Sequence, residues 1–95
     1  MDERYDTHRV VTLSKTIYKT ENEFNLEGMI APRLHNEGET IIKVLNTTVA
    51  PEQAFNFSSN GSIPMQGSEA ILIIEEEDKV SKAVIVYNKI IKISC

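Results

Sequence analysis

Two apolar runs near the C-terminus, residues 70–74 and 80–93, restrict the fold more than any other feature of the sequence. Each is rich in β-branched residues and too short for a helical assignment, so we predict two neighbouring β-strands. An antiparallel strand with one face in water alternates apolar and polar residues. These runs are apolar at successive positions, so both faces of each strand are expected to be covered.

Successive side chains of a strand point to opposite faces. Leu72 and Ile74 therefore share one face of the first strand, and Ala83, Ile85 and Tyr87 share one face of the second. A two-layer domain of this size covers only one face of each sheet with its own second sheet. Unless the N-terminal strands or residues 1–9 fold back over the remaining face, it must contact another molecule. We therefore predict that these five residues form an interface. The predicted core comprises Val11, Leu13, Ile17, Phe24, Leu26, Ile42, Val44, Phe55, Phe57, Ile71, Ile73, Val84 and Val86.

The rest of the chain shows short alternating segments separated by turn residues. Val10 opens one such segment, Phe24 opens another that Pro32 is expected to end, and Asn60-Gly61 is a strong turn dipeptide. No segment has the apolar period of a helix. This spacing predicts an all-β fold, a single-domain antiparallel β-sandwich of jelly-roll or Ig-like type, with a small β-barrel as the alternative. We expect a polar arm at residues 1–9 and the sandwich at residues 10–95.

Charge and cysteine content restrict the partners. The net charge of −4 and the lack of a basic cluster argue against nucleic-acid binding. The single cysteine, Cys95, excludes an intrachain disulfide, and we expect a free thiol there. The charged N-terminus is unlike a signal peptide, and no apolar run approaches the roughly 18 residues of a membrane span. We expect a protein made in a reducing cytoplasm, with no membrane partner.

The sequence offers little for catalysis. His8 and His35 lie in no recognisable metal-ligand spacing, and no phosphate-binding or nucleophile motif is present. The acidic run 75–78 lacks the spaced pattern of a calcium loop, so we interpret it as a solvated hairpin tip that opposes wrong strand pairing. We therefore predict a protein that is not an enzyme, with no catalytic, cofactor-binding or metal-binding residues and no cofactor.

One part of the chain resembles small accessory structural proteins of tailed-phage virions. The segment 36–46 matches a polar turn that opens a strand, and Val49-Ala50-Pro51-Glu52-Gln53-Ala54-Phe55 is similar to their apolar-x-Pro-Gly-Gln-x-Phe element. Glu52 stands where that element has Gly, and the region 10–29 is not covered. The resemblance implies a β-sandwich that decorates or joins parts of a capsid, located in the virion after synthesis in the host cytoplasm. It carries over no catalytic residue.

The leading functional hypothesis is a non-enzymatic structural protein of a repetitive assembly, most simply an accessory, capsid or head-tail component of a phage virion. It would be a homo-oligomer whose partners are further copies of itself and other structural proteins, and its polar arm would reach onto a neighbour. One alternative is a monomeric, cytoplasmic β-sandwich that binds a peptide or glycan. Another is an oligonucleotide-binding barrel of the OB type, which would place aromatic residues beside a basic groove.

Overall fold

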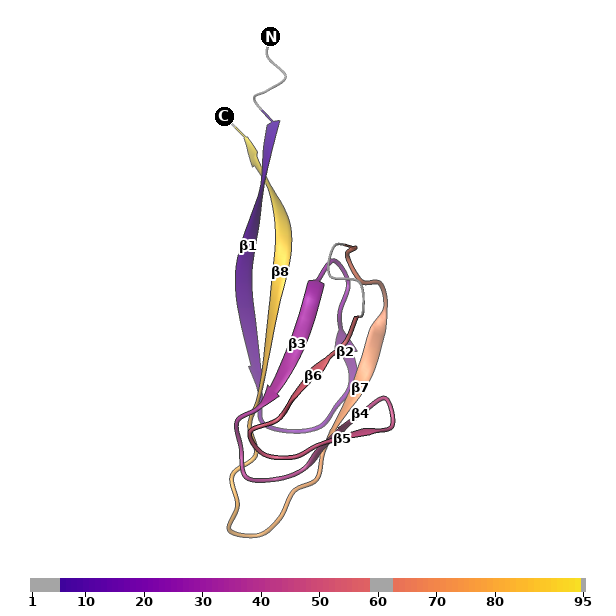
Figure 1. Ribbon diagram of the computed structural model, residues 1–95, viewed down its shortest axis with the longest axis vertical. Helices are drawn as coiled ribbons and strands as arrows, with labels where there is room; N and C mark the ends of the chain where they lie inside the picture. Colours follow the sequence, from indigo (N-terminus) through magenta and orange to yellow (C-terminus); the bar gives the residue numbers. More distant parts are fainter. Residues whose placement is uncertain (1–5, 59–62, 95) are drawn as a thin grey trace.

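In the computed structural model, which describes residues 6–58 and 63–94, two antiparallel four-stranded sheets pack face to face (Figure 1). The strands are β1 (Asp6–Ile17), β2 (Glu21–Asn25), β3 (Ile30–Asn36), β4 (Ile42–Val44), β5 (Thr47–Val49), β6 (Ala54–Asn56), β7 (Ser68–Ile73) and β8 (Ala83–Ser94). No helix occurs among these described residues. The prediction of an all-β sandwich is confirmed.

The strand pairs are nested inside one another. β4 pairs with β5, β3 with β6, β2 with β7, and β1 with β8, all antiparallel, so the chain follows the path of one long hairpin that has been rolled up. Two further pairs, β3 with β8 and β4 with β7, join these hairpin arms into sheets. The sheet orders are β1-β8-β3-β6 and β2-β7-β4-β5, which is the jelly-roll arrangement of an eight-stranded sandwich.

The two C-terminal strands are not neighbours, which corrects the expectation of a C-terminal hairpin. β7 lies in the second sheet and β8 in the first, and the residues between them cross from one sheet to the other. β8 pairs instead with β1 at the other end of the chain and with β3. Strand periodicity gives no information about which strand will become the partner, so it cannot distinguish a hairpin from two strands in different sheets.

The core lies between the sheets. Eight of the predicted core residues are buried there, namely Ile17, Phe24, Leu26, Ile42, Val44, Phe57, Ile71 and Ile73. The rest of the cluster was not predicted as core: Met29, Leu34, Val49, Ala83, Ile85 and Tyr87. Phe55 is half-buried and packs against the cluster from its rim.

The orientation of β8 is the reverse of the predicted one. Ala83, Ile85 and Tyr87 face the core, while Val84 and Val86 lie half-buried on the outer side of the first sheet. β3 settles the orientation, because fully buried Leu34 lies opposite Ile85 in the antiparallel register. Both faces of β8 are apolar, so its own sequence did not indicate which face would be inside.

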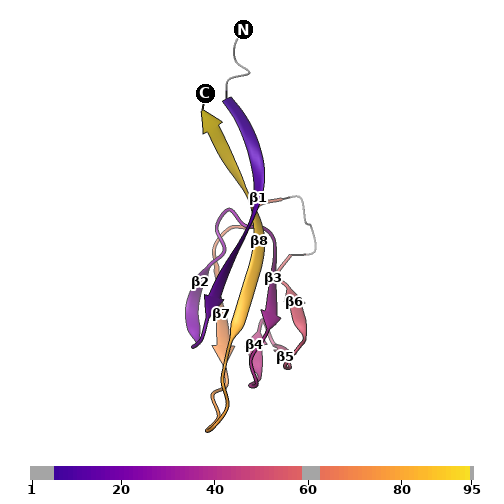
Figure 2. The same cartoon turned by 90° about the vertical axis from the view of Figure 1, so that its left-hand side faces the viewer.

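β1 and β8 extend beyond the sandwich as a two-stranded ribbon (Figures 1 and 2). They pair from Ile17↔Ala83 to Asp6↔Ser94, but β3 accompanies β8 only as far as Ile30↔Asn88. We call residues 6–11 and 89–94 the ribbon. It makes the molecule elongated, with principal extents of 61 × 22 × 21 Å.

Two residues of β1 were wrongly predicted as core. Val11 lies on the ribbon and is only half-buried. Leu13 is exposed although its register partner Tyr87 is buried, and it lies on β1, the edge strand of the first sheet. β1 also begins at Asp6, inside the segment expected to be a polar arm. The remainder of that arm, residues 1–5, lies outside the described residues, as do Asn60-Gly61 and Cys95.

Pro32, which was expected to end a strand, lies buried within β3. The register between β3 and β8 shifts between Ile30 and Arg33, and Ala31 has a positive φ of 51°. This is a β-bulge, one of the few places in a sheet that tolerate the missing N–H of proline. The Pro32 carbonyl still accepts a hydrogen bond of 3.0 Å from the Phe57 N–H.

Asn36, at the end of β3, is a buried polar residue with every group satisfied. Its Nδ2 donates to the carbonyls of Thr40 at 2.7 Å and Val49 at 2.9 Å, and its Oδ1 accepts from the Gly38 N–H at 3.1 Å. One side chain therefore ties together the end of β3, the approach to β4 and the end of β5.

The loop after Asn36 is bonded to the segment that enters β8. The Glu37 N–H donates to the Lys82 carbonyl at 3.0 Å, and the Glu39 N–H donates to the Val80 carbonyl at 2.7 Å. Between them, a Cβ on Gly38 would lie 2.8 Å from the Val80 carbonyl oxygen and closer still to the Lys82 nitrogen. Only glycine allows this approach, which anchors the base of the loop 74–82 between β7 and β8; we call this loop the acidic loop.

Candidate interaction surfaces

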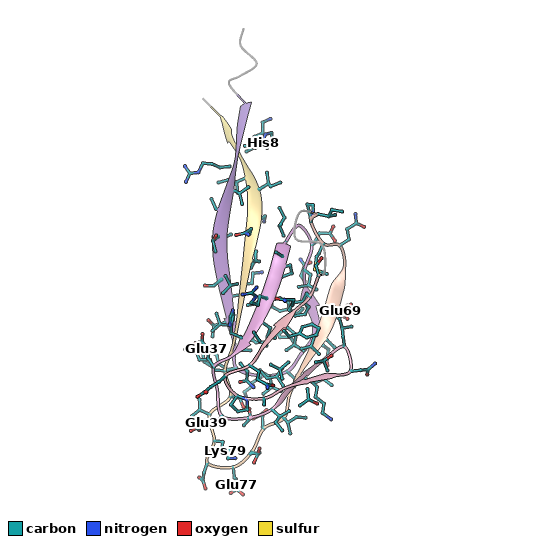
Figure 3. The ribbon with its side chains drawn as sticks, viewed as in Figure 1. His8, Glu37, Glu39, Glu69, Glu77 and Lys79 are labelled. Atoms are coloured by element: carbon teal, nitrogen blue, oxygen red, sulfur yellow. The ribbon has the colours of Figure 1, made fainter. Side chains whose placement is uncertain are left out.

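The groups most often used in catalysis are dispersed. Within residues 6–58 and 63–94, no group of three or more His, Cys, Asp and Glu side chains could hold a metal ion. His8 lies on the ribbon and His35 on β3, in separate parts of the molecule. Figure 3 places Glu77 and Lys79 at the end opposite His8. In the acidic loop, Glu76 forms an exposed ion pair of 3.5 Å with Lys79.

No helix in the described part of the chain is long and apolar enough to cross a membrane.

Exposed apolar side chains gather on the outer face of the second sheet. β7 contributes Leu72 and the residue after it contributes Ile74; these are the two predicted interface residues that are solvent-exposed. β4 and its flanks contribute Ile41 and Leu45, and the exposure of the four side chains ranges from 38% to 50%. We call these four residues, with Ala70, the outer strip. The sequence indicates this strip, because alternation places Ile41 and Leu45 on the face of their segment opposite to Ile42 and Val44.

The strand register makes the outer strip continuous. Lys43 lies opposite Leu72, and the Ile74 N–H donates to the Ile41 carbonyl at 2.9 Å, so β4 and β7 carry their outward residues side by side. A hollow of about 330 Å³ on this face is lined by Lys43, Leu45, Asn46, Glu69, Ala70 and Leu72. The strip is therefore hollowed as well as apolar, and the ammonium group of Lys43 lies near its centre.

Leu45 occupies a backbone position that leucine rarely adopts. It forms the β4–β5 turn with Asn46, and the two residues have positive φ angles of 48° and 65°, as in a type I′ turn. Asn and Gly are the usual residues there, because a left-handed conformation costs other L-residues roughly 1–2 kcal/mol. Strain of this kind is concentrated at functional sites. Leu45 is thus an exposed, conformationally strained apolar side chain beside the hollow.

The other three residues of the predicted interface are not available to a partner. Ala83, Ile85 and Tyr87 are buried in the domain's own core, so the prediction is corrected for them. The residues that do line the outer side of the first sheet are largely polar. Arg33 Nε donates to Asn56 Oδ1 at 2.9 Å, and Thr12 Oγ1 donates to Asn88 Oδ1 at 2.8 Å. A hollow of about 230 Å³ on this side is lined by Ala31, Arg33, His35, Val86, Tyr87 and Asn88.

The ribbon carries a second set of exposed apolar residues, which the sequence analysis did not identify as a surface. Val10 lies opposite Ile90, and Val10 is 63% exposed. On the other side, Arg9 lies opposite Ile91 and Val11 opposite Lys89. An isolated two-stranded ribbon is at best marginally stable in water. Contact with a further molecule would therefore stabilise this element as well as cover it.

Comparison with known proteins found no family model, no curated protein and no solved structure that matches the chain.

Proposed function

We propose that this protein is a non-enzymatic structural subunit of a repetitive assembly and that it contacts its neighbours through the outer strip. The observation that carries the proposal is the continuous group of exposed Ile and Leu side chains on the second sheet. Contiguous exposed apolar patches usually mark interaction sites. Burial of this surface against another copy would contribute about 25 cal/mol per Å² of apolar area.

The strained turn at Leu45 supports the same proposal. A residue that fits the turn poorly is kept where its side chain lines the hollow beside Leu72. Lys43, in the middle of the strip, would keep the free subunit soluble while its aliphatic stem packs against apolar neighbours. These features agree with a surface that is exposed during synthesis and covered after assembly.

The kind of assembly is suggested by two lines of argument. The jelly roll is an architecture of viral capsid domains, although a fold alone does not determine function. The segments 36–46 and 49–57 resemble accessory proteins of tailed-phage virions. We therefore propose the virion of a tailed phage as the assembly, with further copies of this chain and other structural proteins as partners.

Adding a charge to the strip should dissociate the assembly. Ile74→Lys is expected to weaken self-association about tenfold or more, because an ammonium group would lose its hydration in an apolar contact. Lys43→Leu, on the same face, should strengthen association by removing such a group. Sedimentation velocity over a range of concentrations measures both effects, and far-UV circular dichroism checks that the sheets remain. A wild-type chain that stays monomeric at high concentration, with no partner copurifying, would refute the proposed function.

Leu45→Asn should separate folding from assembly. Asn tolerates the left-handed conformation, so we expect the free energy of unfolding to rise by about 0.5–1 kcal/mol. Association should weaken, because the strip loses an apolar side chain. Asn46→Gly is the matched control: it relaxes the same turn and leaves the strip unchanged, so stability should rise without loss of association. Urea unfolding of the monomer and sedimentation test the pair. Unchanged association in Leu45→Asn would exclude Leu45 from the contact.

A glycan-binding module is the second candidate. The observation that favours it is the hollow on the first sheet, which Arg33 and His35 line together with Val86 and Asn88. Lectin domains also use the jelly-roll architecture. A monomeric wild type that binds a glycan, with binding lost in Arg33→Ala, would favour this alternative over the assembly.

A further inference from the structure

The two ends of the long axis differ in composition: His8 lies toward one end, and Glu37, Glu39, Glu77 and Lys79 lie toward the other (Figure 3). The far end consists of the loop 74–82, with Glu75, Glu76, Glu77 and Asp78 in succession, and of the adjoining loop that carries Glu37 and Glu39. Lys79 and Lys82 form ion pairs with Glu76 and Glu37, so carboxylates remain in excess there. We call this the acidic end.

One side of the ribbon combines cationic and apolar side chains. The register places Arg9 beside Ile91 and Val11 beside Lys89, on the side continuous with core-facing Tyr87. Arg9, Lys89 and Ile91 are exposed, and neither cation forms an ion pair with the part of the chain that the structure describes. This side of the ribbon is an extension of the core-facing surface of the first sheet, but no second sheet covers it.

The acidic end has a complementary composition. Its carboxylates are exposed, and Val80, which is 64% exposed, supplies apolar area beside them. The hydrogen bonds from Glu37 and Glu39 to the segment 80–82, together with the bond from the Val80 N–H to Glu39 Oε1 at 2.9 Å, hold its backbone in place. The acidic end is thus a preformed surface with the opposite charge to the ribbon.

We infer that the ribbon of one copy docks on the acidic end of the next copy, so that subunits associate head to tail. The inference rests on the proposed function, because it requires self-association, and it adds a second contact to the one made by the outer strip. Complementary charge favours this pairing. Contact between two ribbons would bring Arg9 and Lys89 against the same cations of the other copy. Contact of the ribbon with the outer strip would bring these cations toward Lys43. A head-to-tail contact is heterologous, so it generates a ring or a filament from one kind of subunit.

Charge reversal at each end tests this inference. The ribbon variant, Arg9→Glu with Lys89→Glu, and the acidic-end variant, Glu75→Lys with Glu77→Lys, should each lose about tenfold or more in association constant. An equimolar mixture of the two variants should recover association to within about threefold of wild type, because each reversed ribbon meets a reversed acidic end. All four substitutions in one chain should also restore association while keeping the net charge at −4.

Sedimentation velocity measures association, and circular dichroism with thermal melting confirms that each variant is folded. If wild type is monomeric, the proposed function fails and the head-to-tail contact fails with it. If wild type associates but the acidic-end variant associates equally well, the proposed function stands and the head-to-tail contact is wrong. If both variants lose association and the mixture does not recover it, the two ends do not meet each other, which also overturns the inference.

Discussion

Asn36→Ala is expected to lower the free energy of unfolding by about 3–5 kcal/mol. The substitution removes two hydrogen bonds to the carbonyls of Thr40 and Val49 and one from the Gly38 N–H. Each buried polar group left without a partner costs about 1–3 kcal/mol. A domain of this size has a total stability of about 5–15 kcal/mol, so the loss should be visible in urea unfolding as a much lower midpoint.

Asn25→Ala is the matched control for this prediction. Asn25 Oδ1 accepts a hydrogen bond of 2.9 Å from the Glu27 N–H, two residues on, just as Asn36 Oδ1 does from Gly38. The Asn25 turn is exposed, so water can replace the lost bond and the change should stay below about 1 kcal/mol. Equal losses in the two variants would mean that the local turn matters and that the buried bonds of Asn36 do not.

Phe57→Ala is expected to cost about 3–5 kcal/mol and to leave the isolated domain largely unfolded. The Phe57 ring is 8% exposed and contacts Phe55 edge to face, with ring centroids 5.3 Å apart and an angle of 89° between the planes. The substitution opens a cavity between the sheets and removes this aromatic pair. Thermal melting followed by circular dichroism measures the effect.

Tyr18→Ala provides the comparison, because Tyr18 is 59% exposed and its loss opens no cavity. Its melting temperature should stay close to that of wild type. A Phe57→Ala protein that melts within a few degrees of Tyr18→Ala would show that the sandwich closes around the gap, and the core would then be more adaptable than we expect.

The fold class followed from the sequence because it depends on local patterns. Alternating and continuous apolar runs identify strands: buried Phe24 and Leu26 were predicted from alternation, and buried Ile71 and Ile73 from a continuous apolar run. Pairing depends on distant residues instead. The β1–β8 and β3–β8 pairs join segments that no local pattern connects, so the predicted C-terminal hairpin was wrong.

The candidate surfaces were predicted in part. Leu72 and Ile74 are exposed, as predicted. Ile71 and Ile73, on the opposite face of the same segment, point into the core, and β7 pairs with β4. Ala83 and Ile85 were assigned to the wrong side, since an apolar strand carries no signal of its own orientation. The ribbon was missed for another reason: strand length beyond the second sheet depends on the neighbouring strands, and β1 looks the same in sequence inside and outside the sandwich.

The nested pairing of strands has a consequence for synthesis on the ribosome. Strand β8 is the last to leave the ribosome, yet it lies in the middle of its sheet, between the first strand and the third. The β4–β5 hairpin can form early, but β1 and β3 must wait for the synthesis of β8 before they gain their common neighbour. Folding dominated by such distant pairings is slow. We therefore expect the first sheet to be completed only after β8 has emerged, with β1 and its ribbon residues without their native strand partner until then.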